Sequence, residues 1–165
     1  MFDSIEKEEI KNFLNNTQGT IYIGCDSQPV SNDFAKYTSV MIVHINNNHG
    51  CKMFGYTHHE RIYDSQRKPR MRLMTEAYKA AELYLEFEDL LVDRDVEIHL
   101  DINTKENHMS HIVSNEAAGY IQGVCGIYPK LKPNSWAASR CADYVVRRKI
   151  KEEALRIAQE HASQM

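Results

Sequence analysis

The feature that most constrains the fold is a change of hydrophobic period near residue 70. Before it lie three short β-branched and aromatic runs, over residues 20–25, 37–45 and 51–63, with a hairpin signal at 46–50. After it, apolar residues over 71–88 recur at helical spacing. Three successive antiparallel strands followed by strand–helix alternation predict a mixed sheet covered by helices.

The remaining segments extend this alternation. We expect a strand at 96–101, a helix near 110–122, an irregular strand at 127–132 that contains Pro129, and a C-terminal helix over 135–162. An N-terminal helix over 1–17 is predicted by the capping-box spacing of Asp3 and Glu6. The expected fold is mixed α+β within the α/β class, with a five-stranded mixed sheet. The chain of 165 residues suits a single domain over 1–165.

Composition narrows the functional classes. No apolar run approaches the roughly 18 residues of a membrane helix, and the start of the chain is too acidic for a signal peptide, so we expect a cytoplasmic protein without membrane contact. The net charge of −3 means that any nucleic-acid contact must come from local basic clusters. The four cysteines are far apart and contain no Cys-x-x-Cys pair, which argues against a structural zinc site.

Two candidate site residues lie at the ends of predicted strands. Asp26 directly follows the first strand, on the face of Tyr22 and Gly24, and Asp101 ends the strand at 96–100. Ligands of such sheets gather beyond the carboxyl ends of the strands. The alternative for both residues is ordinary turn chemistry, which Asp favours.

Two further acidic residues lie on predicted helices. Asp143 lies among apolar residues of the last helix, where an unpartnered charge is costly and a metal ion would supply the partner. The alternative is an i,i+4 pair with Arg147. Glu76 shares a partly inward stripe, whereas Glu82 lies on a solvated face, so Glu76 is the better candidate. Its alternative is an ordinary surface glutamate.

If these four carboxylates converge, they have a specific use. Carboxylates from separate elements can hold two divalent cations about 3.5–4 Å apart, which together promote phosphodiester cleavage. Mg²⁺ and Mn²⁺ prefer oxygen ligands of this kind. The sequence therefore predicts a site for two Mg²⁺ or Mn²⁺ ions.

Three blocks point to a family. They are residues 21–28 (IYIGCDSQ), residues 99–103 (HLDIN), and residues 132–139 (KPNSWAAS) with Ala142-Asp143. In this order and spacing the blocks resemble the ribonuclease-H-like family typified by bacterial YkuK, over roughly residues 18 to 148. The resemblance implies a ribonuclease-H-like fold.

The wider superfamily cleaves nucleic-acid phosphodiesters with two metals. By resemblance, Asp26, Asp101 and Asp143 match its metal-binding acidic residues, and Glu76 matches the helical glutamate in position only. These four residues are the expected catalytic and metal-binding set. Ser27 and Asn103 are expected to assist them because of their proximity in sequence.

Basic residues crowd the approach to the Glu76 helix and form the expected nucleic-acid-binding cluster: Arg61, Arg67, Lys68, Arg70 and Arg72. The alternative is a solvated helix face. A second cluster over 147–151 is better explained as a solvated helix face.

His108 and His111 could share an ion on a helix, but no third ligand is evident, and one of them could instead act as a proton shuttle.

Three functions follow from these residues. The first is a nuclease dependent on Mg²⁺ or Mn²⁺ that acts on RNA or DNA. The second is a non-catalytic nucleic-acid-binding or assembly module with the same fold. The four carboxylates favour the first function, and the lack of a recognisable module for RNA–DNA hybrids leaves room for the second. The third is a metal-dependent hydrolase of a small phosphorylated molecule.

Overall fold

A computed structural model describes residues 1–62, 68–103, 108–137, 155–156, 158–160 and 162–163. The elements of the domain are α1 (Ser4–Asn16), β1 (Ile21–Pro29), β2 (Phe34–His44), the 3₁₀ turn η1 (Ile45–Asn47), β3 (Cys51–Arg61), α2 (Lys68–Glu86), α3 (Glu88–Leu91), β4 (Val96–Leu100) and α4 (His108–Cys125). The predicted order of elements is confirmed as far as α4. Most of the predicted C-terminal helix lies outside the described residues.

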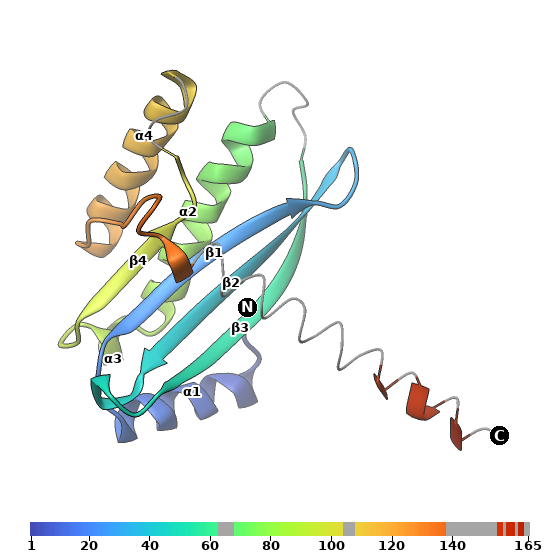
Figure 1. The fold of residues 1–165 in the computed structure, drawn as a ribbon, viewed down its shortest axis with the longest axis vertical. Helices are drawn as coiled ribbons and strands as arrows, with labels where there is room; N and C mark the ends of the chain where they lie inside the picture. Colours follow the sequence, from blue (N-terminus) through green and yellow to red (C-terminus); the bar gives the residue numbers. More distant parts are fainter. Residues whose placement is uncertain (63–67, 104–107, 138–154, 157, 161, 164–165) are drawn as a thin grey trace.

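The sheet has the order β3-β2-β1-β4, with β1 antiparallel to β2 and parallel to β4. Helix α2 packs against β1, β2 and β4 and lies beside α4 (Figure 1). The residues of β1 at positions 21, 23 and 25 are fully buried on the face that α2 covers. Helix α1 covers the same face of β3, where Phe13 meets Phe54 at 5.5 Å between ring centroids.

Local sequence signals account for two element boundaries. The Asp3 carboxylate accepts from the Glu6 N–H and the Glu6 carboxylate from the Asp3 N–H, so the predicted capping box is present. The predicted hairpin is also confirmed, and Asn46 and Asn47 turn it with φ of 51° and 61°. Asparagine tolerates this left-handed region better than most residues.

The prediction of a fifth strand over 127–132 is wrong, because the described residues form four strands. The segment lies beside β4 but joins it by a single bridge, from Lys130 to His99. The Lys130 N–H donates to the Ile98 carbonyl at 2.8 Å, and the Lys130 carbonyl accepts from the Leu100 N–H at 2.9 Å. The next N–H that faces β4, that of Lys132, donates to the Ile102 carbonyl at 3.2 Å and not to that of Leu100, so the pairing leaves the register of a regular parallel ladder.

No helix in the described part of the chain is both long enough and apolar enough to cross a membrane.

Candidate functional site

Asp26 lies within β1 and not after it, which corrects the predicted strand end. Strand β1 continues to Pro29 because its polar end pairs with β2, with Asp26 opposite Thr38 and Ser27 opposite Tyr37. The partner strand thus extends a segment whose own residues are typical of a turn.

Asp26 lies on β1, and Asp101 directly follows the neighbouring parallel strand β4. The ladder between β1 and β4 pairs Gly24 with His99 and ends with Cys25 opposite Leu100. The next residue after each of this last pair is an aspartate, and in β1 alternation directs Asp26 to the face of Gly24. Both aspartates are half-buried. The sheet therefore brings these two carboxylates to the same end of two adjacent strands.

Glu76 reaches this end of the sheet from α2. Its side chain is 3% exposed, and its Oε1 accepts a hydrogen bond from the Ser27 hydroxyl, which is also buried. Its other oxygen, Oε2, is buried and has no hydrogen-bond partner among the described residues. Glu82, the alternative on the same helix, is exposed. Of the two glutamates, Glu76 is the one turned towards the sheet.

The electrostatics of Glu76 link it to both aspartates. The pKa of Glu76 is raised to about 8, mainly by burial and also by the negative charges of Asp26 and Asp101, against the opposing effects of the Ser27 hydrogen bond and of Arg72. A carboxyl group with this pKa is largely protonated at neutral pH. The three acidic side chains are therefore close enough for each aspartate to affect the protonation of Glu76.

The residues that could hold a metal ion have the oxygen donors that Mg²⁺ and Mn²⁺ prefer. The Oε2 atom of Glu76 is one such oxygen, buried and without a hydrogen-bond partner among the described residues. In the described part of the chain, however, no three His, Cys, Asp or Glu side chains are grouped closely enough to hold an ion. Asp143 lies outside the described residues, and Asn103 is half-buried beyond β4.

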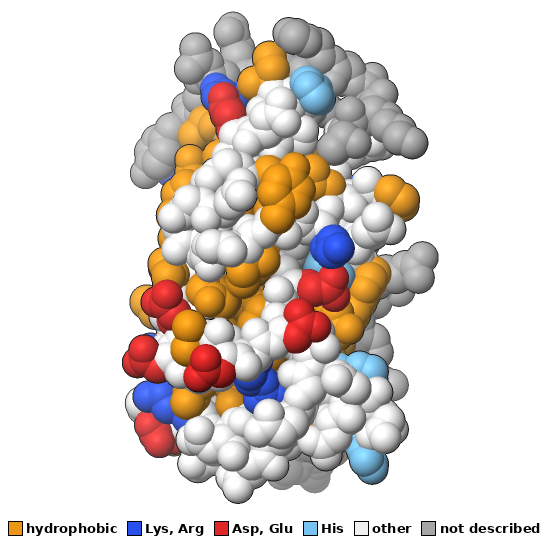
Figure 2. All heavy atoms as spheres, turned by 90° about the vertical axis from the view of Figure 1, so that its left-hand side faces the viewer, with side chains coloured by type: hydrophobic (Ala, Val, Ile, Leu, Met, Phe, Trp, Pro, Cys, Tyr) orange, Lys and Arg blue, Asp and Glu red, His pale blue; other side chains and the backbone are white. Residues whose placement is uncertain are grey.

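The predicted basic cluster divides into distinct environments. Arg72 lies at the site, with its Nη1 3.4 Å from the Ser27 carbonyl oxygen and 3.5 Å from the Ser27 hydroxyl. Arg70 instead forms a two-pronged contact with Glu116 on α4, at 2.7 Å to each oxygen. Arg61 is exposed at the end of β3, Lys68 begins α2, and Arg67 lies outside the described residues. Figure 2 shows acidic and basic side chains mixed on one face, without a broad basic patch.

His99 has a role that the sequence analysis missed. The imidazole is 1% exposed, and its Nδ1 accepts a hydrogen bond from the Ala137 N–H at 3.1 Å. It meets Tyr22 and Trp136 edge to face, at 5.7 Å and 5.2 Å between ring centroids. Burial, together with the charge of Lys130, lowers the pKa of His99 to about 4. Neutral His99, which lies two residues before Asp101, therefore holds residues 136–137 against β4.

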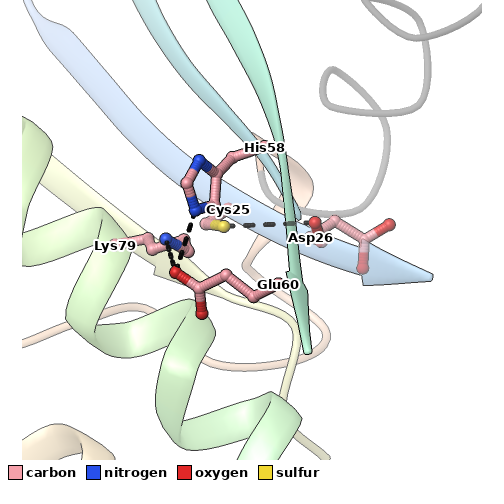
Figure 3. Close-up of polar contacts among 5 residues, drawn as sticks. All are labelled: Cys25, Asp26, His58, Glu60 and Lys79. Carbon is pink, nitrogen blue, oxygen red and sulfur yellow. Dashed lines mark hydrogen bonds and ion pairs between the residues drawn. The ribbon is translucent and has the colours of Figure 1, made fainter. Parts of the chain in front are cut away.

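A second polar cluster lies beside the site on the α2 face of the sheet. Glu60 Oε1 contacts Lys79 Nζ at 2.7 Å and His58 Nε2 at 3.0 Å (Figure 3). The carboxylate of Asp26 points away from this group. Lys79 is nearly buried, and the ion pair with Glu60 compensates its charge. This cluster joins β3 to α2 and does not include the carboxylates of the candidate site.

Comparison with known proteins agrees with this arrangement. Neither the curated proteins nor the solved structures that were searched include a significant match. A family model described as Ribonuclease H-like matches residues 2–147, most of the chain. The matched region covers all four strands, and the mixed sheet with its helical cover is consistent with such a fold. The resemblance seen in the three sequence blocks is confirmed, and the chain belongs to the ribonuclease H-like family typified by YkuK.

Proposed function

We propose that this protein is a divalent-metal-dependent nuclease that hydrolyses phosphodiester bonds of RNA or DNA. The observation that carries the proposal is the Oε2 atom of Glu76, a buried carboxylate oxygen without a described partner. It lies within electrostatic reach of Asp26 and Asp101. Three acidic side chains from three elements repel one another unless a cation or a proton compensates their charge. The family membership adds that the fold is of a kind found in nucleases.

The proposed ligands are Asp26, Glu76 and Asp101, with Asp143 as the fourth acidic residue. Bound Mg²⁺ or Mn²⁺ would supply the Lewis acidity that activates a water and stabilises the leaving oxygen. The chain itself holds the carboxylates in place. Pairing with Thr38 fixes the backbone of Asp26, Asp101 directly follows β4, and the Ser27 hydroxyl fixes one oxygen of Glu76. Ser27 is thus proposed to orient a ligand, while Asn103 lies near enough in sequence to Asp101 to assist it.

Arg72 is the basic residue that this site favours for contact with a nucleic-acid phosphate. It lies against Ser27, and its charge opposes the rise in the pKa of Glu76. Its contacts with Ser27 are long and leave hydrogen-bonding capacity for a phosphate oxygen. Arg70 is a poorer candidate because Glu116 already holds its guanidinium.

The first experiment is a Mn²⁺ titration by calorimetry on the wild type, Asp101→Asn and Glu97→Gln. Glu97 is the matched control because it lies on β4, four residues before Asp101, and is not a proposed ligand. We expect saturable binding that Asp101→Asn weakens at least tenfold and Glu97→Gln leaves within about twofold. No saturable binding, or equal binding by both variants, would contradict the proposed metal site.

A cleavage assay then tests the activity. Single-stranded and duplex RNA, DNA and hybrids are incubated with Mg²⁺ or Mn²⁺ and, as a control, with a chelator. The proposal expects metal-dependent cleavage of at least one substrate, abolished by Asp101→Asn. Binding to nucleic acid without cleavage by any metal-loaded sample would favour the non-catalytic binding module instead.

A further inference from the structure

Two lysines face the carboxylates of β4 from the neighbouring segment. The hydrogen bonds of Lys130 hold this segment alongside β4, and the Lys132 N–H donates to the Ile102 carbonyl at 3.2 Å. Lys130 Nζ lies 3.8 Å from an oxygen of Glu97, and Lys132 Nζ lies 2.9 Å from Oδ1 of Asp101. The two ammonium groups therefore repeat the same contact two residues apart, but only Lys132 reaches a candidate metal ligand.

Lys132 and Asp101 form a close ion pair. Oδ1 of Asp101 is buried, and the Lys132 Nζ lies 2.9 Å from it. The attraction between these opposite charges is Coulombic, so another cation can replace the ammonium. Lys132 also has a side chain that is 47% exposed, so it can leave the carboxylate without a cavity forming.

Two candidate ligands carry negative charge at this end of the sheet. Asp26 and Asp101 each lie one residue beyond Cys25 and Leu100, the last pair of the β1–β4 ladder. The Lys132 ammonium, 2.9 Å from Oδ1, supplies a positive charge to the Asp101 carboxylate. The metal-free site thus has a substitute for part of the charge that a divalent cation would bring.

We infer that Lys132 is a built-in counter-ion of Asp101 that competes with the divalent cation for the same oxygen. The inference rests on the proposed function. Mg²⁺ lies about 2.0–2.1 Å from its ligand oxygens, so an ammonium held on Oδ1 repels a divalent cation at that atom. Metal binding through Oδ1 of Asp101 should therefore displace the Lys132 ammonium. Its backbone remains held by Ile102, so the released ammonium stays near the site as a positioning residue for an anionic substrate.

The test is Mn²⁺ calorimetry at low ionic strength on the wild type, Lys132→Gln, Lys132→Arg and Lys130→Gln. Lys130→Gln is the matched control, because it removes the same charge from the same segment beside a carboxylate that is not a proposed ligand. We expect Lys132→Gln to bind Mn²⁺ roughly 3- to 10-fold more tightly than the wild type, as loss of one partly exposed ion pair would allow. Lys132→Arg and Lys130→Gln should stay within about twofold of the wild type.

A second measurement needs no variant. Side-chain NMR signals of the lysines are followed during a Mg²⁺ titration of the wild type. The Lys132 signal should shift with the midpoint of metal binding, while the Lys130 signal should not.

Each outcome decides between the two proposals. Metal binding by the wild type with an equal or lower affinity in Lys132→Gln, or with no shift of the Lys132 signal, overturns the counter-ion and leaves the metal site standing. If Lys132→Gln binds Mn²⁺ and the other three proteins do not, the result supports strong competition between the Lys132 ammonium and the metal ion for Asp101. Absence of binding in all four proteins and of any shift overturns the proposed metal site and the counter-ion with it.

Discussion

The Ser27 hydroxyl donates a hydrogen bond to Oε1 of Glu76, and both side chains are buried between β1 and α2. Ser27 directly follows Asp26 but points to the opposite face of the sheet. The hydrogen bond therefore ties the helical glutamate to the strand that carries the first candidate aspartate. It also lowers the pKa of Glu76, in opposition to the effect of burial. The Ser27 hydroxyl thus affects both the position of the Glu76 side chain and its protonation.

Replacing Ser27 by Ala should destabilise the protein, and more strongly at pH 8 than at pH 5. The substitution removes the hydrogen bond to Oε1 of Glu76, so that neither buried oxygen has a partner among the described residues. Such a defect costs about 1–3 kcal/mol. The loss is larger where the carboxyl is ionised, because the hydrogen bond stabilises the charged form. Urea unfolding at the two pH values measures it. Ser31→Ala, in the exposed turn between β1 and β2, is the control, and equal losses in both variants would contradict the prediction.

In the wild type, the titration of Glu76 should lower the free energy of unfolding as the pH rises towards 8. Glu76→Gln should abolish this effect. The pKa of Glu76 is raised from 4.5 to about 8, so the unfolded chain releases this proton at lower pH than the folded chain. Stability is then lost as the pH rises from 4.5 towards 8, by up to about 1.4 kcal/mol for each pH unit. Glu76→Gln has no proton to release and should be more stable than the wild type at pH 8 in the absence of metal.

Glu82→Gln is the control for this experiment, because Glu82 lies on the same helix and is exposed. Chemical unfolding at several pH values between 6.5 and 8, above the range in which His99 contributes, gives the comparison with a chelator present. A pH dependence in Glu76→Gln as steep as that of Glu82→Gln would show that Glu76 is not the group responsible.

The sequence predicted the elements better than their ends. Asp3 and Glu6 form a cap within four residues, so local pattern suffices there. The end of β1 depends on β2, because Asp26 and Ser27 are kept in the strand by Thr38 and Tyr37. A local pattern does not contain that partner, which is why these polar residues were predicted to form a turn.

For the candidate site too, local sequence patterns indicated some residues, whereas contacts between distant segments were not predictable. Helical spacing favoured Glu76 over Glu82, and the structure buries the first and exposes the second. The position of Asp101 after an apolar strand was also readable. The role of His99 was not, because its partner Ala137 lies 38 residues further along the chain. The same is true of Lys132, which reaches Asp101 only through the pairing of its segment with β4.

His99→Phe should destabilise the protein at pH 7 by about 1–3 kcal/mol, because it leaves the buried Ala137 N–H without its acceptor. Phenylalanine keeps an aromatic ring against Tyr22 and Trp136. The control is Tyr22→Phe, which keeps the ring of the same cluster and removes only a hydroxyl. Thermal unfolding measures both, and a loss in His99→Phe no larger than in Tyr22→Phe would contradict the anchoring role.

The acid side of the stability profile should also change in His99→Phe. The pKa of His99 is lowered from 6.5 to about 4, so the unfolded chain takes up this proton at higher pH than the folded chain. Stability from the neutral imidazole is lost as the pH falls from 6.5 towards 4. Between pH 4.5 and 6.5 this slope opposes that of Glu76, so the contributions of the two groups partly cancel in the wild type. His99→Phe should instead lose stability steadily as the pH rises through that window.

Arg72→Gln should weaken binding to single-stranded RNA or DNA, whereas Arg70→Gln should have little effect. Both variants remove one positive charge from the first turns of α2, so they are matched in net charge. Arg72 lies at the site beside Ser27, while Arg70 is already neutralised by Glu116 at 2.7 Å. If Arg72 contacts one phosphate, its loss should reduce the slope of log affinity against log salt by about 0.7 on a single strand.

Fluorescence anisotropy with a labelled oligonucleotide at several salt concentrations gives both quantities. Mg²⁺ is replaced by Ca²⁺ or a chelator so that the strand stays intact. A lower affinity with an unchanged salt slope in Arg72→Gln would indicate a rearranged site and not a lost phosphate contact. Equal weakening in both variants would mean that the oligonucleotide responds to the overall charge of α2. It would contradict a specific phosphate contact with Arg72 beside Ser27.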